Sequence, residues 1–235
     1  MTRSARARLA ARAPHVPATT RRAQYSASTR RALVGVAEGL FAEHGYAATS
    51  LDAIVAGAEV TKGALYHHFS GKQALFEAVF EQVEAAGAAQ IQTALEGHRD
   101  PWEKAIAGLR AFLAVVRQPS YSRIVVQDGP SVLGYERFRE QEERSTFAYV
   151  LDIVRAVLAA GDWWVDEAME RTVARIFFGA MSSAGTAVSR SNDADTEAER
   201  VELAIGFILS GLRALSEQSP ERTDTRPVSG TTSRT

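Results

Sequence analysis

Residues 61–72 read TKGALYHHFSGK, and this stretch decides the fold of the first third of the chain. Thr61 can cap the start of a helix, because its hydroxyl can accept a hydrogen bond from a free backbone N–H. Leu65 and Phe69 are four positions apart and therefore give that helix one apolar side. If they point inward, His67 points almost directly away from the core at about 100° per residue.

The rest of this short helix is patterned for an outside surface. Gly63 and Ala64 flank His67 on the outward side, and Tyr66 and His68 lie to either side of it. Small residues allow a close approach, while polar groups at the centre and flanks can reach base edges and the two phosphate walls of a major groove. The stretch therefore predicts the second helix of a helix-turn-helix motif.

Charge along the chain supports the same interpretation. Residues 1–72 carry ten basic and four acidic side chains, a net charge of +6, which leaves −7 for the remainder of a chain whose total is −1. Thr61 and Lys62 begin the short helix, where free N–H groups favour phosphate. Lys72 adds a further positive charge just after it. A basic module on an acidic body indicates a polyanion as the partner.

Almost everything between residues 26 and 216 has helical periodicity. We expect a helix over 28–44 that Gly45 ends, a short helix capped by Thr49 or Ser50, and a fourth helix over about 70–97 that begins with a Ser70–Gln73 capping box. Later helices fit four ranges, 101–117, 134–160, 166–189 and 195–216. The only β-branched run, SRIVVQ at 122–127, is too isolated to build a sheet, so the fold class is all-α with about nine helices.

Both ends of the chain are polar and aperiodic. Residues 1–25 predict a disordered basic arm, although their composition also resembles an organelle transit peptide, and residues 217–235 predict a disordered tail. The chain has no cysteine, which excludes disulfides and thiol chemistry. No apolar run is long enough to span a bilayer, so we expect no membrane partner and a cytoplasmic protein.

The adjacent histidines do not predict a metal site. Neighbouring helical residues point about 100° apart, whereas an i, i+4 pair would share a face. No cysteine or nearby acidic pair completes a ligand shell. The chain contains no catalytic signature, and the small residues of GAMSSAG at 179–185 suit close helix packing. We therefore expect no metal, no cofactor and no enzymatic activity.

The stretch YAATSLDAIVAGAEVTKGALYHHFSGKQALFEAVFEQV, residues 46–83, resembles the DNA-binding domain of the tetracycline-repressor (TetR) family of bacterial transcription regulators. The resemblance covers about residues 28–83. It implies a homodimer on a palindromic double-stranded DNA operator, with a DNA-binding domain over 26–72 and a ligand-binding and dimerisation domain over 73–216. The positions that match the family's DNA contacts are Ser50, Thr61, Lys62, Gly63, Ala64, Tyr66, His67, His68 and Lys72.

Two acidic residues depart from the family pattern. Glu59 stands in the turn before the reading helix, where the family usually has glycine, and Asp52 lies on the preceding short helix. If the backbone at Glu59 has a positive φ, a non-glycine residue costs about 1 kcal/mol there. Glu59 also opposes phosphate, and the arginines of the N-terminal arm could compensate by contacting phosphates or entering a minor groove.

The helices over 166–189 and 195–216 are apolar over a wide arc, which predicts burial on more than one side. Residues expected at a dimer interface are Ile176, Ala180, Ala184, Ile205, Ile208 and Leu212. Residues expected to line a ligand pocket are Trp102, Phe112, Tyr121, Phe138, Phe147, Tyr149, Phe177 and Met181. This inventory favours a small, largely apolar effector that releases a repressor from its operator. A helical enzyme and a constitutive DNA-binding protein are the alternatives.

Overall fold

The computed structural model describes residues 18–163 and 165–218, and these residues form ten α-helices and one π-helix without a strand. The all-α fold class is therefore confirmed. In chain order the elements are α1 (Ala18–Ala48), α2 (Leu51–Gly57), α3 (Lys62–His68), α4 (Lys72–Leu95), α5 (Pro101–Val116), η1 (Tyr121–Asp128), α6 (Gly129–Leu133), α7 (Tyr135–Ser145), α8 (Phe147–Ala160), α9 (Glu167–Arg190) and α10 (Ala194–Gln218).

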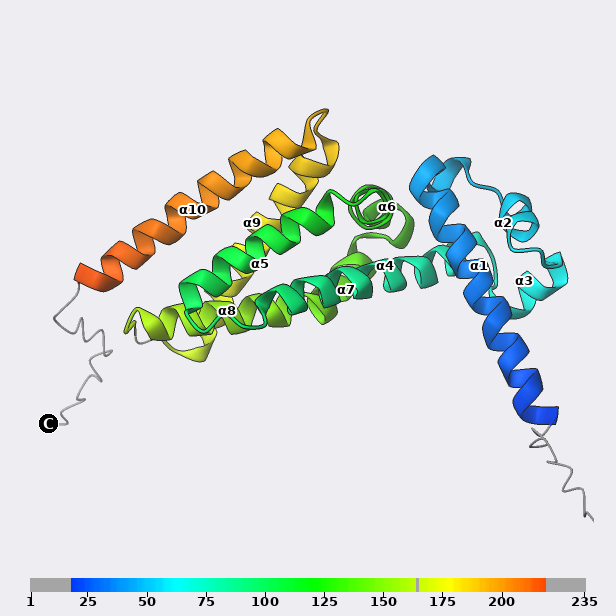
Figure 1. Cartoon of the computed structure of the whole chain (residues 1–235), viewed down its shortest axis with the longest axis horizontal. Coiled ribbons are helices and arrows are strands. Elements are labelled where there is room, and N and C mark those ends of the chain that lie inside the picture. The colour runs from blue at the N-terminus through cyan, green and yellow to red at the C-terminus, as the bar shows by residue number, and fades with distance from the viewer. Residues whose placement is uncertain (1–17, 164, 219–235) are drawn as a thin grey trace, which may run out of the picture.

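The helices are arranged as a small head and a larger body (Figure 1). We call α1, α2 and α3 the head, and α4 to α10 with η1 the body. Helix α4 begins beside the head and runs the length of the body against α5. The π-helix η1 packs against α1, α4 and α9, so it lies where the head and the body meet. Helices α9 and α10 lie on the side of the body away from α4 (Figure 1).

One hydrophobic core continues from the head into the body. Phe41 of α1 and Phe76 of α4 are fully buried, and their rings meet edge to face at 5.3 Å between centroids. Phe80, one turn further along α4, is equally buried. Burial of such rings contributes about 1.5–3 kcal/mol each, so these side chains hold the start of α4 firmly against the head.

The predicted helix starts in the head are confirmed. The Ser50 hydroxyl accepts a hydrogen bond from Ala53 N at 3.1 Å, and the Thr61 hydroxyl accepts one from Ala64 N at 3.1 Å. Gly45 has φ +77° and interrupts α1 at the predicted place, and the helix resumes only to residue 48. Glycine adopts this left-handed region without the steric cost that a Cβ brings.

The start of α1 was predicted wrongly. The helix is already present at residue 18, so residues 18–25 belong to it and not to a disordered arm. Ser28 does not cap the helix, because its hydroxyl donates to the Tyr25 carbonyl at 2.8 Å instead of accepting from a free N–H. Neither glycine nor proline occurs between residues 18 and 34, so nothing stops the helix. Residues 1–17 and 219–235, predicted to be disordered, lie outside the described residues.

The capping box at the start of α4 was also wrong. Gly71 occupies the N-cap position, and no side chain caps the helix. The Gln73 side chain instead donates to the Val132 carbonyl at 3.0 Å, a contact with α6 that only the tertiary fold creates. Sequence spacing alone could not distinguish these two uses of Gln73.

Two further differences lie in the middle of the chain. The predicted helix over 134–160 is divided at Thr146 into α7 and α8. The β-branched run at 122–127 lies within η1, and helix continues through Gly129 and Pro130, between the ranges 101–117 and 134–160 that were predicted to be helical. Pro130 is tolerated because it stands in the first turn of α6, where its missing N–H would have no partner.

Candidate functional site

Helix α3 presents a polar surface on a buried apolar base. Leu65 and Phe69 are 1% and 5% exposed, which confirms their inward direction. Tyr66 is 58% exposed, His67 is exposed and His68 is half-buried. The two imidazole rings are 5.3 Å apart and edge to face, so they point in different directions. Thr61, Lys62 and Gly63 are exposed and Ala64 is half-buried, as is required of a helix whose N-terminal turn approaches a partner.

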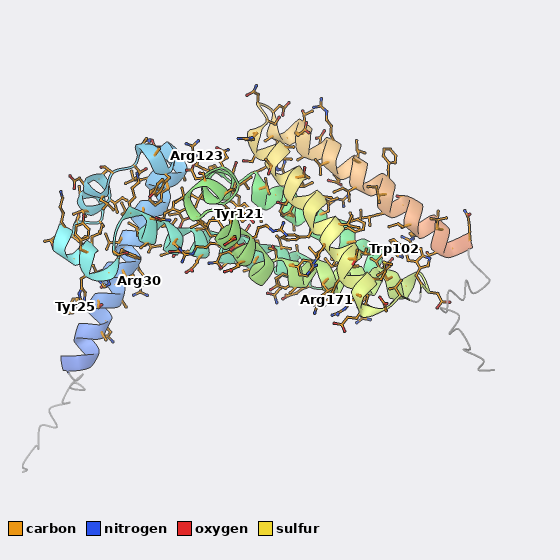
Figure 2. The ribbon with its side chains drawn as sticks, turned by 180° about the vertical axis from the view of Figure 1, so that it is seen from behind. Tyr25, Arg30, Trp102, Tyr121, Arg123 and Arg171 are labelled. Atoms are coloured by element: carbon orange, nitrogen blue, oxygen red, sulfur yellow. The ribbon has the colours of Figure 1, made fainter. Side chains whose placement is uncertain are left out.

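The long helix α1 holds the end of α3 in place. The Arg30 guanidinium lies over the Phe69 ring, 5.3 Å from its centroid, where the ring's negative face attracts the cation. Arg30 and Tyr25 lie on the part of α1 that extends away from the rest of the head (Figure 2). Tyr25 is 69% exposed. Arg30, within the predicted helix, therefore adds an exposed cation close to α3, whereas Tyr25 lies in the stretch that was predicted to be a disordered arm.

Lys62 is paired with an acid in the free protein. Its Nζ lies 2.6 Å from Asp52 Oδ1 of α2, and both side chains are largely exposed. The hydrogen bond that Lys62 donates to the Asp52 carboxylate, together with the negative charge of that carboxylate, raises the pKa of Lys62 above its usual 10.5. Asp52 therefore orients Lys62 beside the first turn of α3, and a phosphate would have to compete with this carboxylate.

Three further residues near α3 have constrained geometry. Glu59 has φ +54°, so the condition under which a non-glycine residue is strained in the turn before α3 is met. Lys72 does not extend freely, because its Nζ donates to the Ala47 carbonyl at 3.3 Å and lies 4.4 Å from the centroid of the Tyr46 ring. Ser50 is exposed at the start of α2 while its hydroxyl caps the helix.

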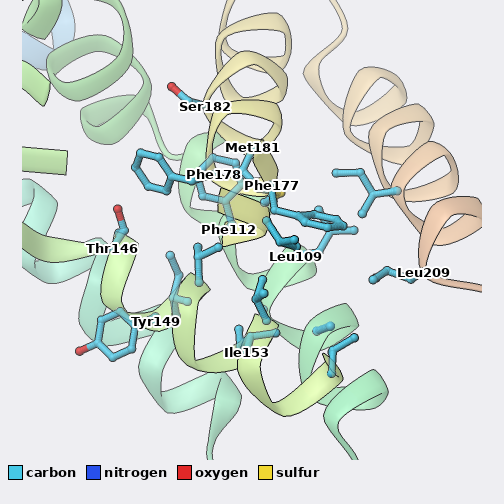
Figure 3. A pocket seen from close by; sticks show the side chains of 18 of the residues that line it. Leu109, Phe112, Thr146, Tyr149, Ile153, Phe177, Phe178, Met181, Ser182 and Leu209 are labelled. Carbon is cyan, nitrogen blue, oxygen red and sulfur yellow. The ribbon is translucent and has the colours of Figure 1, made fainter. Parts of the chain in front are cut away.

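The body contains a partly open cavity of about 920 Å³ (Figure 3). Its lining comes from every element of the body, α4 to α10 and η1, and is mostly aliphatic and aromatic. Phe112, Tyr149 and Phe177 reach it from α5, α8 and α9 respectively (Figure 3). A volume of this size accommodates a drug-sized molecule, and an apolar lining with a few polar groups is typical of ligand sites.

The polar groups of the cavity are few and include acids. Glu84 of α4 is only 4% exposed and lies in the lining, as does the exposed Asp162. Hydroxyl groups come from Tyr121, Ser182 and Thr186 among others. No lysine, arginine or histidine occurs among the described residues that line the cavity. Its described wall therefore has acidic and hydrogen-bonding groups without a positive charge.

Most, but not all, of the aromatic residues predicted for the pocket line this cavity. Those that do are Phe112, Tyr121, Phe138, Tyr149, Phe177 and Met181. Trp102 lies behind the wall, edge to face with the cavity residue Trp163 at 6.4 Å between centroids. Phe147 packs against Phe178 at 5.7 Å and contributes to a small core cluster between α8 and α9. Helical spacing alone did not distinguish these two core positions from the cavity wall.

Helices α9 and α10 carry large apolar side chains that the chain itself leaves exposed. The most exposed are Phe207 at 77%, Ile176 at 66% and Leu203 at 64%. Among the predicted interface residues, Ile176, Ala180 and Ile208 are exposed and Ala184 is half-buried. Ile205 and Leu212 instead lie in the cavity lining. We call the exposed residues Ile176, Ala180, Leu203, Phe207, Ile208 and Leu215 the apolar face.

Comparison with known proteins assigns both parts of the chain. Residues 33–79 match the family described as bacterial regulatory proteins of the tetR family, and residues 102–212 match the tetracyclin repressor-like C-terminal domain. A solved TetR-family transcriptional regulator from Pectobacterium atrosepticum is 30% identical, with a TM-score of 0.68, over 80% of this chain and 96% of that one. The chain belongs to the TetR family.

Curated TetR-family relatives match only part of this chain. The transposon Tn10 TetC protein of Escherichia coli is 30% identical over 132 residues, which are 56% of this chain and 64% of TetC. The probable acrEF/envCD operon repressor of E. coli strain K12 is 33% identical over 102 residues, which are 41% of this chain and 46% of that protein. The chain thus aligns with less than two thirds of either curated relative.

The sequence analysis missed two features of this TetR-family chain, the first without a sequence signal and the second despite one. Glu84 looks like a surface position on a long helix, yet the fold buries it at the cavity. Leu203 and Phe207 follow helical spacing on α10, so the exposed side of that helix could have been found from its periodicity.

Among the described residues, no cluster of three His, Asp or Glu side chains could hold a metal ion. None of the helices within residues 18–163 and 165–218 combines the length and hydrophobicity needed to cross a bilayer.

Proposed function

We propose that the protein is a homodimeric DNA-binding transcriptional repressor that a small, largely apolar effector releases from its operator. One observation carries this proposal: helix α4 starts directly beyond the exposed reading helix α3 and continues into the wall of a cavity large enough for a ligand. A ligand site and a DNA-reading surface therefore share one rigid element. Acting on chromosomal DNA, such a protein would be cytoplasmic.

DNA contact is proposed for the exposed side of the head. The residues are Ser50, Thr61, Lys62, Gly63, Ala64, Tyr66, His67, His68 and Lys72. The glycine and alanine permit the approach, His67 and Tyr66 reach outward, and the two lysines can contact phosphates. Because α3 has only seven residues, a single copy reads few base pairs. Two copies on half-sites about 34–36 Å apart would supply the missing specificity.

The apolar face supports a two-fold dimer. Exposed side chains such as Phe207 and Ile176 lie on two helices that the body leaves uncovered, and a contiguous apolar patch of this kind marks an association site. Burial of each large side chain contributes about 1.5–3 kcal/mol. The small residues Gly179 and Ala180 on α9 would let the partner's helices approach closely.

The cavity supports a neutral or cationic effector. Apolar side chains supply most of its affinity, and hydroxyls and the Glu84 carboxyl can accept hydrogen bonds from it. Because no described lining residue is basic, an anionic ligand would meet acidic groups without a described compensating charge. The effector would favour a conformer in which α4 carries the heads away from the groove spacing of the operator.

The test begins with duplexes that the purified protein selects from genomic DNA. Ligands identified by thermal shift are then added to the operator complex, and DNA affinity and subunit mass are measured together. We expect a ligand to lower operator affinity at least tenfold while the dimer stays intact. His67→Ala should abolish operator selection, while the matched control His98→Ala, an exposed histidine of the body, should not. Release through dimer dissociation would refute the mechanism, and operator binding that no cavity ligand alters would support a constitutive DNA-binding protein instead.

A further inference from the structure

A polar junction joins the head to the body on the side of η1. The carboxylate of Asp128, at the end of η1, accepts a hydrogen bond from the backbone N–H of Tyr46 at 2.7 Å. Arg123, on the same element, places its Nε 3.5 Å from the same Asp128 oxygen. We call Gly45, Tyr46, Arg123 and Asp128 the junction; Arg123 is shown between head and body in Figure 2.

The backbone of α1 is shaped to fit this junction. Gly45, with φ +77°, lies against the Arg123 guanidinium, and a Cβ at position 45 would collide with it. The Gly45 carbonyl accepts a hydrogen bond from the Thr49 hydroxyl at 2.8 Å, and Thr49 immediately precedes the cap of α2. The left-handed backbone therefore favours glycine at position 45, and a larger residue there would also have to displace the Arg123 guanidinium.

Tyr46 connects the junction to the reading helix. Its ring packs edge to face on Phe76 of α4 at 5.1 Å between centroids. The ammonium group of Lys72, the first residue of α4, lies over the same ring. Helix α3 ends only a few residues before Lys72. A displacement of the Tyr46 backbone therefore moves the point from which α3 is held.

The other side of η1 lines the cavity. Tyr121, Val125 and Val126 line it, although Arg123 and Asp128 of the same element face the head. A π-helix is rare, and such elements are frequently found at functional sites. A ligand that presses on Val126 therefore acts on the element that holds Tyr46.

A chain of hydrogen bonds also links the junction to α9. Arg123 Nη1 donates to Gln127 Oε1 at 3.2 Å, and Gln127 Nε2 donates to the Ser189 carbonyl at 3.1 Å. The Ser122 and Ser189 hydroxyls are 2.6 Å apart. Ser189 stands one turn beyond Thr186, which lines the cavity. Two walls of the cavity, η1 and α9, are thus connected to the same arginine.

We infer that Arg123 and Asp128 are positioning residues: they set the angle of the head on the body and transmit the occupancy of the cavity through η1 to Tyr46. This rests on the proposed function for its biological purpose, but the coupling itself is a property of the free protein. The Arg123 Nε is buried and has no hydrogen-bond partner among the described residues. The ion pair with Asp128 therefore lacks a directional hydrogen bond from Nε that would fix its geometry.

The coupling is tested by amide hydrogen exchange of the full chain, with no ligand or DNA present. Val126→Phe fills the cavity from η1 and stands in for a ligand there; Val157→Phe fills it from α8 as the matched control. We expect the Tyr46 amide to exchange at least tenfold faster in Val126→Phe and in Asp128→Ala, and at the wild-type rate in Val157→Phe. An unchanged Tyr46 rate in Val126→Phe, or equal rates in the two cavity variants, would overturn the inference. Core amides of α4 report any general loss of stability, and acceleration of these amides as well as Tyr46 would also overturn it.

The positioning role is tested separately on selected operator duplexes whose half-sites are moved apart by one to three base pairs. Asp128→Ala should reduce the preference for the best spacing about tenfold while leaving affinity for a single half-site unchanged. Asp195→Ala, which removes an exposed ion pair with Arg117 on the body, is the control. A preference retained in Asp128→Ala refutes the positioning role. If the wild-type protein shows no preference for any spacing, the proposal that a dimer binds two half-sites is refuted instead. The hydrogen-exchange experiment then still tests the coupling between η1 and Tyr46.

Discussion

Replacement of Glu59 by glycine should stabilise the protein and strengthen DNA binding, for two separable reasons. Glu59 has φ +54°, a region that costs an L-residue about 1–2 kcal/mol. Glycine removes that cost, but its greater freedom in the unfolded chain lowers the free energy of unfolding by about 0.5–1 kcal/mol. The net gain is about 0.5–1 kcal/mol in the free energy of unfolding. For a chain of this size, this raises the Tm by about 1–4 °C.

The charge effect is worked from Coulomb's law. A carboxylate about 10 Å from one phosphate in water opposes it by about 0.4 kcal/mol, which is a twofold loss of affinity for each head. Glu59→Gln removes the charge and keeps the strained backbone, so it should raise operator affinity without raising the Tm. The affinity gain should shrink as added salt shortens the screening length.

Asp162 supplies the matched control, because it is the other described non-glycine residue with a positive φ, at +55°, and it lies in the body. Aspartate tolerates this region better than glutamate, so Asp162→Gly should raise the Tm less than Glu59→Gly and should leave DNA affinity unchanged. Differential scanning calorimetry and fluorescence anisotropy measure the two effects. The reasoning is refuted if Glu59→Gly melts no higher than Glu59→Gln.

Three other outcomes are expected. Asp52→Asn releases Lys62 for a phosphate, so the plot of log affinity against log salt should steepen by about 0.9 for each head, and an unchanged slope would contradict the role of this pair. Phe207→Glu places a charge at the most exposed position of the apolar face and should produce monomers in sedimentation; dimers that persist would exclude that face from the interface. The hydrogen bonds from Thr196 lower the pKa of Asp193 below its usual 3.8. Their stabilisation is therefore present above pH 3.8 and is lost as the pH falls through the folded-state pKa, so the difference in Tm between wild type and Asp193→Ala should vanish in acid and would be constant if the bonds were unimportant.

The local features of the head could be predicted because short-range chemistry determines them. Ser50 and Thr61 cap their helices through bonds to backbone three residues away, and Leu65 and Phe69 follow from helical spacing alone. In each case the partner lies within a few residues along the chain, so the sequence contains the whole interaction.

Features that depend on distant partners could not be predicted in this way. Gln73 could have capped α4, but the Val132 carbonyl, 59 residues away, takes its side chain. Trp102 and Phe112 lie on the same helix and both look suited to a pocket, yet only the packing of α8 and α9 decides which one reaches the cavity. Asp128 gave no signal at all, because its partner is a backbone N–H 82 residues away.

The uninterrupted helix from Ala18 to Gly45 has a mechanical consequence. At about 1.5 Å per residue this part of α1 is a rod about 40 Å long. The rod is clamped near Gly45 by the junction and near its middle by Arg30 on Phe69. A rotation of the head by about 10° around Gly45 would sweep the far end of a rod of this length through about 7 Å. A small change of angle at the junction therefore produces a large displacement of the N-terminal turns of α1.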